Sequence, residues 1–256
     1  MSPTTFRLDE IRDAIKPFRL HWFSRLRSTS DHALTLRRAR ALYAPAVVLT
    51  GHQIAGRGRG SNTWWSGPGV LTATFVLPID TTLDAFQLPL VAGLTVRHAA
   101  AELSGDGGIS LKWPNDILYG QRKLAGLLCE RAEGVDLVGI GLNVCPDRSH
   151  IPREVANRVV SLSDISPGKV DMTHTLICLA SHLRQMIRLR TEVPYSQLLR
   201  EYDQYHALVG RRVTVLPGPG ETPVSGKCEG VDAIGRLLIR DGATLHRLIA
   251  GQVQRY

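Results

Sequence analysis

The chain has 256 residues, of which 43% are hydrophobic and 21% are charged, and its formal net charge is +8. This composition predicts a globular protein with one large core and a small second domain, and it excludes an intrinsically disordered chain. The basic balance favours anionic partners such as nucleotides, nucleic acid or an acidic protein, although charge governs association rather than fold.

The cysteine spacing and the N-terminal segment indicate a reducing compartment. The four cysteines lie far apart, with no CxxC pair and no accompanying histidine spacing, so neither a zinc site nor a disulfide framework is predicted. The first 15 residues lack the basic and then apolar pattern of a signal peptide. No apolar run approaches the roughly 18 residues needed to cross a bilayer. A cytoplasmic location without membrane attachment is therefore expected.

The N-terminal part predicts a helix, a strand and a second helix. A short helix is expected over residues 7–15, because the apolar spacing is helical and a proline follows. Residues 19–26 alternate enough to predict an edge strand. A helix over 31–43 follows a hydroxyl-rich corner, in which Ser30 or Asp31 is the expected N-cap.

The segment 53–64, QIAGRGRGSNTW, is the predicted centre of the molecule. Its glycines alternate with Arg57 and Arg59, so a backbone free to adopt positive φ carries two permanent cations and exposed amides, which suits an anion. The apolar runs 45–51 and 69–78 are predicted strands on either side. The loop matches neither a Walker phosphate loop nor a dinucleotide-binding fingerprint. A flexible glycine-rich loop, or an RGG-like nucleic-acid-binding segment, is the alternative.

The middle of the chain predicts a buried helix followed by two pairs of strands. Residues 86–103 have apolar side chains at helical spacing and are expected to pack against the sheet. Two short strands over 109–119 are expected to meet at a corner near Pro114. Strands over 122–133 and 135–144 are expected to form a hairpin.

Several polar or small residues in these strands are candidates for a ligand pocket. Lys112 lies in an apolar run, so it either reaches solvent at the sheet edge or points into a pocket. Gly126, Gly139 and Gly141 interrupt apolar strands, where glycine loses packing unless a backbone or a ligand comes close. A bulge would explain each glycine separately, and Asn143 is compatible with a simple turn former.

The C-terminal third predicts two helices and a small β domain. Amphipathic helices are expected over 173–190 and 195–208, after a polar segment rich in proline and serine. Beyond them, short β-rich runs separated by GPGE, AIG and DGA turns are typical of a small barrel. The predicted domains are a catalytic domain over 1–206 and a β-barrel domain over 207–256.

The order of these motifs resembles that of the biotin protein ligase family. The most specific segments are GRGRGSNTW (56–64), KWPND (112–116) and RKLAGLLCE (122–130), and the resemblance runs from about residue 20 to the end. It implies an α+β fold like that of class II synthetases. This fold has a mixed or antiparallel sheet with helices on one face, followed by a small SH3-like β-barrel.

The resemblance implies a two-step reaction that uses ATP and biotin. The biotin carboxylate attacks the α-phosphate to give biotinyl-5'-AMP and pyrophosphate. A specific lysine of a biotin carboxyl carrier domain, part of a biotin-dependent carboxylase, then takes the biotinyl group. Fixed cations and backbone donors must neutralise the charge that moves to pyrophosphate. Mg²⁺ is expected to be carried by ATP, with no protein metal site.

Matching to the family motifs assigns expected roles to individual residues. Lys112 and Arg59 are the expected catalytic residues, and both act electrostatically rather than as nucleophiles. The residues expected to contact biotin are Ser28, Thr29, Ser30, Gln53, Gly56, Arg57, Arg59, Lys112, Gly139 and Gly141. Those expected to contact ATP are Arg57, Arg59, Trp64, Lys112 and Asn143.

Three features qualify the resemblance. Asn62 stands where many relatives have a third arginine, which removes a potential phosphate cation, and Ser30 stands where asparagine is common. Roughly 20 residues precede the first core strand, too few for the helix-turn-helix of the bifunctional members. A ligase that does not bind DNA, either a monomer or a homodimer, is therefore expected.

Two other functions are alternatives to this interpretation. Lipoate ligases share the fold and the adenylate chemistry, but they lack KWPND following GRGRG. The non-enzyme alternative is a basic nucleic-acid-binding protein that uses the arginine-glycine loop and the small barrel. The scattered basic residues of the C-terminal segment and its lack of interleaved surface aromatic residues disfavour that alternative.

Overall fold

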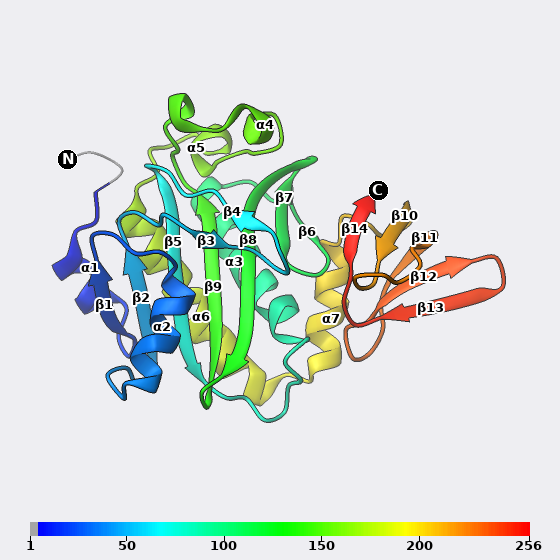
Figure 1. The fold of residues 1–256 in the computed structure, drawn as a ribbon, viewed down its shortest axis with the longest axis horizontal. Coiled ribbons are helices and arrows are strands. Elements are labelled where there is room, and N and C mark those ends of the chain that lie inside the picture. Colours follow the sequence, from blue (N-terminus) through cyan, green and yellow to red (C-terminus); the bar gives the residue numbers. More distant parts are fainter. Residues whose placement is uncertain (1–4) are drawn as a thin grey trace.

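The large sheet organises the molecule in the computed structural model, which describes residues 5–256 except for the side chains of Arg190 and Thr191 (Figure 1). Its strand order is β1-β2-β5-β9-β8-β7-β6, where β1 pairs parallel with β2 and the other neighbours pair antiparallel. The predicted mixed sheet is confirmed, with the first strand at its edge. The strand bounds are β1 Arg19–Phe23, β2 Ala46–Thr50, β5 Val70–Pro78, β6 Ile109–Lys112, β7 Asp116–Tyr119, β8 Arg122–Ala132 and β9 Val135–Asn143.

Strand β5 shows that the sheet has one face that contacts the main hydrophobic core, here called the dry face, and one face that is polar. Successive side chains of a strand point to opposite faces. Leu71, Ala73 and Phe75 therefore enter the main hydrophobic core, whereas Thr72 and Thr74 face the other way and are also buried. The polar face carries the candidate site.

Most of the helices cover the dry face. Helix α3 (Leu88–Ser104) packs on β6, β7 and β8, and α6 (Met172–Glu192) packs on α3. Both helices run behind the sheet in Figure 1. Two further helices, α1 (Leu8–Ala14) and α7 (Tyr195–Gln204), contact this pair.

Helix α2 (Thr29–Arg38) lies on the opposite face of the sheet, against β2, β5 and β9. It covers a small second core that includes Ala33, Val48, Val76 and Leu137. The sequence predicted helices on one face of the sheet, and α2 adds a helix on the other face. Strand β2 is buried along its whole length, so apolar side chains on both of its faces need cover.

The start of α2 differs from the sequence prediction. Ser28 has extended φ and ψ angles, and its side chain accepts a hydrogen bond of 3.3 Å from the Asp31 amide, so Ser28 is the N-cap. The prediction that Ser30 or Asp31 caps this helix is wrong. Thr29 and Ser30 instead occupy the first turn, where both are buried. The helix also ends earlier than predicted, before Arg40, whose φ is +54°.

The glycine-rich segment folds as a small hairpin above the polar face. Strand β3 (Gly56–Arg57) pairs antiparallel with β4 (Thr63–Trp64). The Gly58 amide donates to the Asn62 carbonyl at 2.8 Å, and Gly60 has a φ of +62° at the tip. The positive φ explains the need for glycine at that position.

The C-terminal part forms the predicted small β domain. Its five antiparallel strands have the order β13-β12-β11-β10-β14. Their bounds are β10 Arg212–Leu216, β11 Val224–Val231, β12 Leu237–Asp241, β13 Thr244–Leu248 and β14 Gln252–Arg255. The segment that leads into this domain is hydrogen-bonded to β6. The Leu111 amide donates to the Tyr205 carbonyl, and the Ala207 amide donates to the Leu111 carbonyl.

The polar segment between β9 and α6 contains short helical turns, namely η1 Arg148–His150, α4 Arg153–Ala156 and α5 Leu162–Ile165. Of the helices in residues 5–256, none is long and apolar enough to span a bilayer.

Candidate functional site

A cavity of about 410 Å³ opens on the polar face of the large sheet. Its walls come from the start of α2, the β3–β4 hairpin, the corner between β6 and β7, strands β8 and β9, and the start of β14. The cavity brings together most of the residues predicted from the sequence, namely Ser28, Thr29, Ser30, Gln53, Arg57, Arg59, Trp64, Lys112, Gly139 and Gly141.

One wall of the cavity is an uncharged hydrogen-bonding cluster. Gln53 Oε1 accepts from the Thr29 amide at 2.9 Å, and Thr74 Oγ1 donates to Thr29 Oγ1 at 2.8 Å. Ser30 Oγ lies 3.0 Å from Thr74 Oγ1. All four residues are buried. This wall can offer uncharged donors and acceptors to a neutral polar group.

The opposite wall is cationic. Lys112 comes from the end of β6, and burial lowers the pKa of its ammonium group, an effect partly opposed by the Asp116 carboxylate. Burial also lowers the pKa of Arg59, which stays charged at neutral pH. Lys123 also lines the cavity and forms a 2.5 Å ion pair with Asp116. Among the described residues, neither Lys112 nor Arg59 forms an ion pair with a carboxylate.

The residues on either side of β14 contact Lys112 and Arg59. Arg59 donates a hydrogen bond to the carbonyl of Gly251. The Lys112 Nζ lies 4.3 Å from the ring centroid of Tyr256, within the range of a cation–π interaction. The small β domain therefore supplies part of the cavity wall through residues 251–253, which follow Lys112 by more than a hundred residues in the chain.

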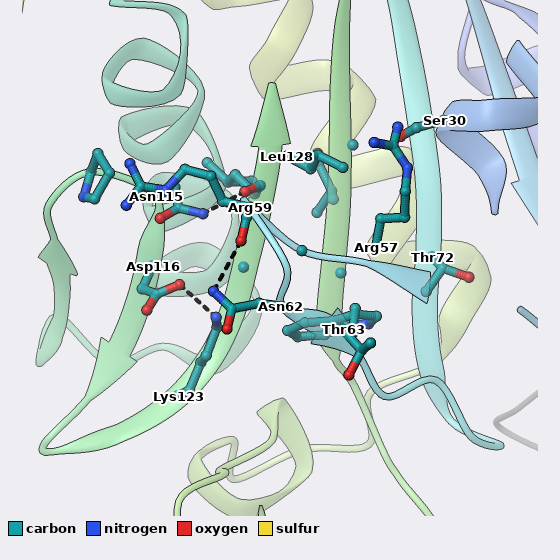
Figure 2. A pocket seen from close by; sticks show the side chains of 18 of the residues that line it. Ser30, Arg57, Arg59, Asn62, Thr63, Thr72, Asn115, Asp116, Lys123 and Leu128 are labelled. Atoms are coloured by element: carbon teal, nitrogen blue, oxygen red, sulfur yellow. Dashed lines mark hydrogen bonds and ion pairs between the residues drawn. The ribbon is translucent and has the colours of Figure 1, made fainter. Parts of the chain in front are cut away.

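The two arginines of the hairpin point in opposite directions, as Figure 2 shows. Arg57 points toward Ser30, and it pairs with Asp31 at 2.8 Å and with Glu130 at 2.8 Å. Its charge is thus compensated within the protein. Arg59 points to the side from which Asn115 and Asp116 project, so it is the hairpin cation available to an anionic ligand.

The strand glycines admit protein side chains to the sheet surface. A Cβ at Gly141 would lie 2.2 Å from Cε2 of Trp64. At Gly139 it would lie 2.9 Å from Ser30 Oγ. Both distances are shorter than real Cβ contacts, so larger residues would displace the hairpin or the first turn of α2. Gly126, which the sequence analysis also singled out, lines the same cavity.

Two predicted site residues lie outside the cavity lining. Asn143 is buried, and its Nδ2 donates to the carbonyls of Lys123 and Val160, each at 3.1 Å. Its side chain therefore ties β8 and β9 to the segment that follows. Gly56 lets the hairpin fold tightly, since a Cβ there would lie 2.5 Å from the Trp64 carbonyl oxygen. Their predicted ligand contacts stay predictions.

Asn62, which replaces a common arginine, lines the cavity from the hairpin tip. Its Nδ2 donates to the Arg59 carbonyl at 2.9 Å (Figure 2). Asn62 therefore orders the loop backbone through a hydrogen bond, and this role does not require a charged side chain.

Sequence reasoning missed several residues of the cavity. Asp116 and Lys123 lie in motifs that it did single out, and their ion pair could have been sought there. Thr72 lies on β5, where the pattern of alternating faces marks it as a polar residue on the site side. No local signal marks Arg158 or residues 251–253, because only the tertiary fold brings them to the cavity.

Comparisons with known proteins show which family this chain is similar to. The model of the biotin/lipoate A/B protein ligase family matches residues 22–147. A biotin acetyl-CoA-carboxylase ligase from Mycobacterium tuberculosis is 33% identical over 81% of this chain and 77% of its own length. The corresponding ligase from Paracoccus denitrificans is 30% identical over 89% of this chain and 97% of its own length.

Solved structures show the same fold. The biotin protein ligase from Aquifex aeolicus, in complex with biotin and ATP, superposes with a TM-score of 0.80 at 28% identity. The superposition covers 92% of this chain and 97% of the Aquifex chain.

Proposed function

Because this chain belongs to the biotin/lipoate A/B protein ligase family, we propose that it activates biotin with ATP and transfers biotin to a protein. The biotin carboxylate attacks the α-phosphate of ATP, which forms biotinyl-5'-AMP and releases pyrophosphate. The amine of a lysine in a biotin carboxyl carrier domain then attacks the acyl carbon and releases AMP.

One observation carries this proposal: a single cavity has an uncharged hydrogen-bonding wall and a cationic wall, in which Lys112 and Arg59 form no ion pair with a carboxylate of the described residues. The ureido ring of biotin is neutral and needs donors and acceptors, which Thr29 and Gln53 supply. The carboxylate and the triphosphate are anionic, and they meet at Lys112 and Arg59. Two negatively charged reactants can approach one another there because fixed cations offset their repulsion.

Lys112 holds the reacting groups together in this scheme. Its ammonium contacts the biotin carboxylate and the α-phosphate, so it stabilises the charge that develops as the leaving pyrophosphate departs. Arg59 lies on the hairpin and brings a second cation when ligands bind. The nucleophile of the second step is supplied by the carrier domain.

The hairpin has a further role as a cover. Closing over the ligands excludes water, which would otherwise hydrolyse the adenylate before the acceptor lysine arrives. Trp64 anchors the base of the hairpin on β9, so the tip around Gly60 is the part that is free to move.

Mg²⁺ belongs to this scheme as a companion of ATP. Asp116 is the carboxylate that lines the cavity among the described residues, and it is already paired with Lys123. The charged side chains that line the cavity are therefore mainly cationic, which suits a polyanion that brings its own metal ion. When bound, Mg²⁺ would neutralise phosphate charge, and Asp116 is the residue that could approach it.

The chain is proposed to act in the cytoplasm as a monomer or a homodimer, without binding DNA. Among the described residues, the thiols of Cys129, Cys178 and Cys228 form no disulfide bond.

The test is a modification assay on a carrier domain. The chain is incubated with MgATP, a biotin carboxyl carrier domain and either biotin or lipoate, and the intact mass of the carrier is measured. A carrier with its acceptor lysine changed to arginine is the control. The proposal requires one biotinyl group on the native carrier and none on the control. Lipoylation without biotinylation would assign the chain to the lipoate branch of the family.

A further inference from the structure

We propose that Glu102, Cys178 and His182 form a zinc-binding site on the face of the molecule opposite the cavity. Glu102 belongs to α3, and Cys178 and His182 belong to α6. These two helices pack against each other behind the sheet (Figure 1). The site is therefore separate from the proposed biotin and ATP cavity, and it does not depend on the proposed function.

Helical spacing places two of the ligands together. Cys178 and His182 are four residues apart on α6, and side chains at this spacing lie one above the other on the same helix face. Glu102 faces them from α3. The sequence showed no metal motif because the third ligand is 76 and 80 residues away from the other two in the chain.

The distances suit a tetrahedral ion. Glu102 Oε2 lies 2.8 Å from His182 Nε2, and Cys178 Sγ lies 3.6 Å from Glu102 Oε1. One ligand atom from each residue can be chosen so that all three lie within 4.8 Å of one another. Zinc bonds of about 2.0–2.3 Å place the ligands of a tetrahedron roughly 3.4 Å apart, so only small side-chain movements are needed.

The donor set selects the class of metal. A thiolate, an imidazole and a carboxylate are all ligands of zinc, whereas Mg²⁺ and Ca²⁺ prefer oxygen donors. The thiolate and the carboxylate together offset the two positive charges of the ion. Burial raises the pKa of Cys178 to about 12, so the bare thiol is neutral, and binding releases its proton to solvent.

A metal ion can reach this cluster from solvent, because two of the three ligand side chains are partly exposed. Cys178 is buried, but the Glu102 side chain is 64% exposed and the His182 side chain is 19% exposed. Water can therefore complete the fourth coordination position from the open side. The His98 ring stacks on His182 with 6.4 Å between ring centroids, and His98 itself is held by Glu201 at 2.8 Å. This support orients the His182 ring.

The arrangement differs from a simple surface ion pair. A hydrogen bond between His182 and Glu102 needs no third partner, and a buried cysteine in a helix interface ordinarily packs as a small hydrophobic residue. Here the Cys178 thiol lies 3.8 Å from the Ala99 carbonyl oxygen and 3.6 Å from the Glu102 carboxylate. The convergence of three different ligand types on one point is the feature that indicates a metal.

The test is a titration of the tag-free, chelator-treated full chain with Co²⁺, which reports thiolate coordination by a charge-transfer band in the near ultraviolet. One equivalent of Co²⁺ should produce the band, and Zn²⁺ should abolish it by displacement. Cys178→Ser should remove the band, while Cys129→Ser, a matched change of a cysteine on β8, should keep it. Glu102→Gln, at an exposed position that folding tolerates, should weaken Zn²⁺ affinity at least about tenfold.

Two results would overturn the proposal. One is the absence of the band from the unmodified chain. The other is Zn²⁺ binding of equal affinity in the unmodified chain, Cys178→Ser and Glu102→Gln, which would indicate adventitious surface binding.

Discussion

The indole of Trp64 lies on the backbone of Gly141, so close that a Cβ at position 141 would stand 2.2 Å from the ring. The indole Nε1 is buried and has no hydrogen-bond partner in residues 5–256, so packing rather than a hydrogen bond holds the ring there. Lys123 Nζ lies 5.4 Å from the ring centroid. The base of the β3–β4 hairpin, which carries Arg59, therefore packs on β9 through a contact that only a glycine at position 141 permits.

Gly141→Ala should displace this ring and shift the hairpin that carries Arg59. Overpacking of this kind costs about 1–3 kcal/mol, so kcat/KM for adenylate formation should fall roughly 5-fold to 150-fold. Gly107→Ala is the matched control, because a Cβ there meets no atom within 4 Å. Steady-state pyrophosphate release measures both variants, and equal rates would show that the seating of Trp64 does not matter.

Arg59 and Arg57 should respond differently to the same change. Arg59→Met removes a cation that faces the cavity, and kcat/KM should fall by roughly 100-fold, as for other groups that stabilise developing charge. Arg57→Met removes the pairs with Asp31 and Glu130, so it should loosen the hairpin with a smaller effect on the chemistry.

Limited proteolysis separates these two effects. Cleavage within residues 57–63 should be faster in Arg57→Met than in the unmodified chain, and biotin with ATP should protect the unmodified chain. The same cleavage rate with and without ligands would argue against closure of the hairpin.

The reaction should lose rate at high pH as Lys112 deprotonates. An ordinary lysine has a pKa of about 10.4, and burial lowers the pKa of Lys112, so its charge is lost at a lower pH than usual. The alkaline limb of kcat/KM should therefore fall below that value. Lys112→Arg should move the limb to higher pH, since guanidinium stays charged. An alkaline limb that is the same in both proteins would assign it to another group.

Asp136 should matter for stability and not for catalysis. Its side chain is 2% exposed and pairs with Arg131, which also donates to the carbonyls of Leu83 and Asp80. Asp136→Ala removes the buried carboxylate partner of this partly exposed arginine, which should cost about 2 kcal/mol of unfolding free energy. Urea unfolding measures the loss, and activity per folded molecule should be unchanged. Glu229→Gln, which breaks an exposed pair with Arg240, should change the urea midpoint little.

The sequence predicted what depends on local pattern. Lys112, Arg59 and the residues around Thr29 lie in motifs with a defined purpose, and the strands around them have clear periodicity. It could not predict that Gly251 contacts Arg59 or that Tyr256 contacts Lys112, because contacts across more than a hundred residues leave no local signal. The ligand contacts assigned to Arg57 stay a prediction, and the sequence could not show that its charge is paired with Asp31 and Glu130.

Side-chain placement explains the other differences. Ser28, rather than Ser30 or Asp31, caps α2, since the choice among adjacent hydroxyl and carboxylate residues depends on one backbone angle. The strand glycines admit Trp64 and Ser30, which periodicity alone cannot distinguish from close approach of a ligand.

The central claim is that Lys112 supplies the charge that lets biotin carboxylate attack ATP. The most direct measurement is single-turnover formation of biotinyl-5'-AMP by Lys112→Met, in a protein whose circular dichroism confirms the fold. Adenylate formation should be nearly abolished, while transfer from added biotinyl-5'-AMP to the carrier domain should be retained in part. Adenylate formation at the unmodified rate in the folded variant would show that Lys112 does not have this role.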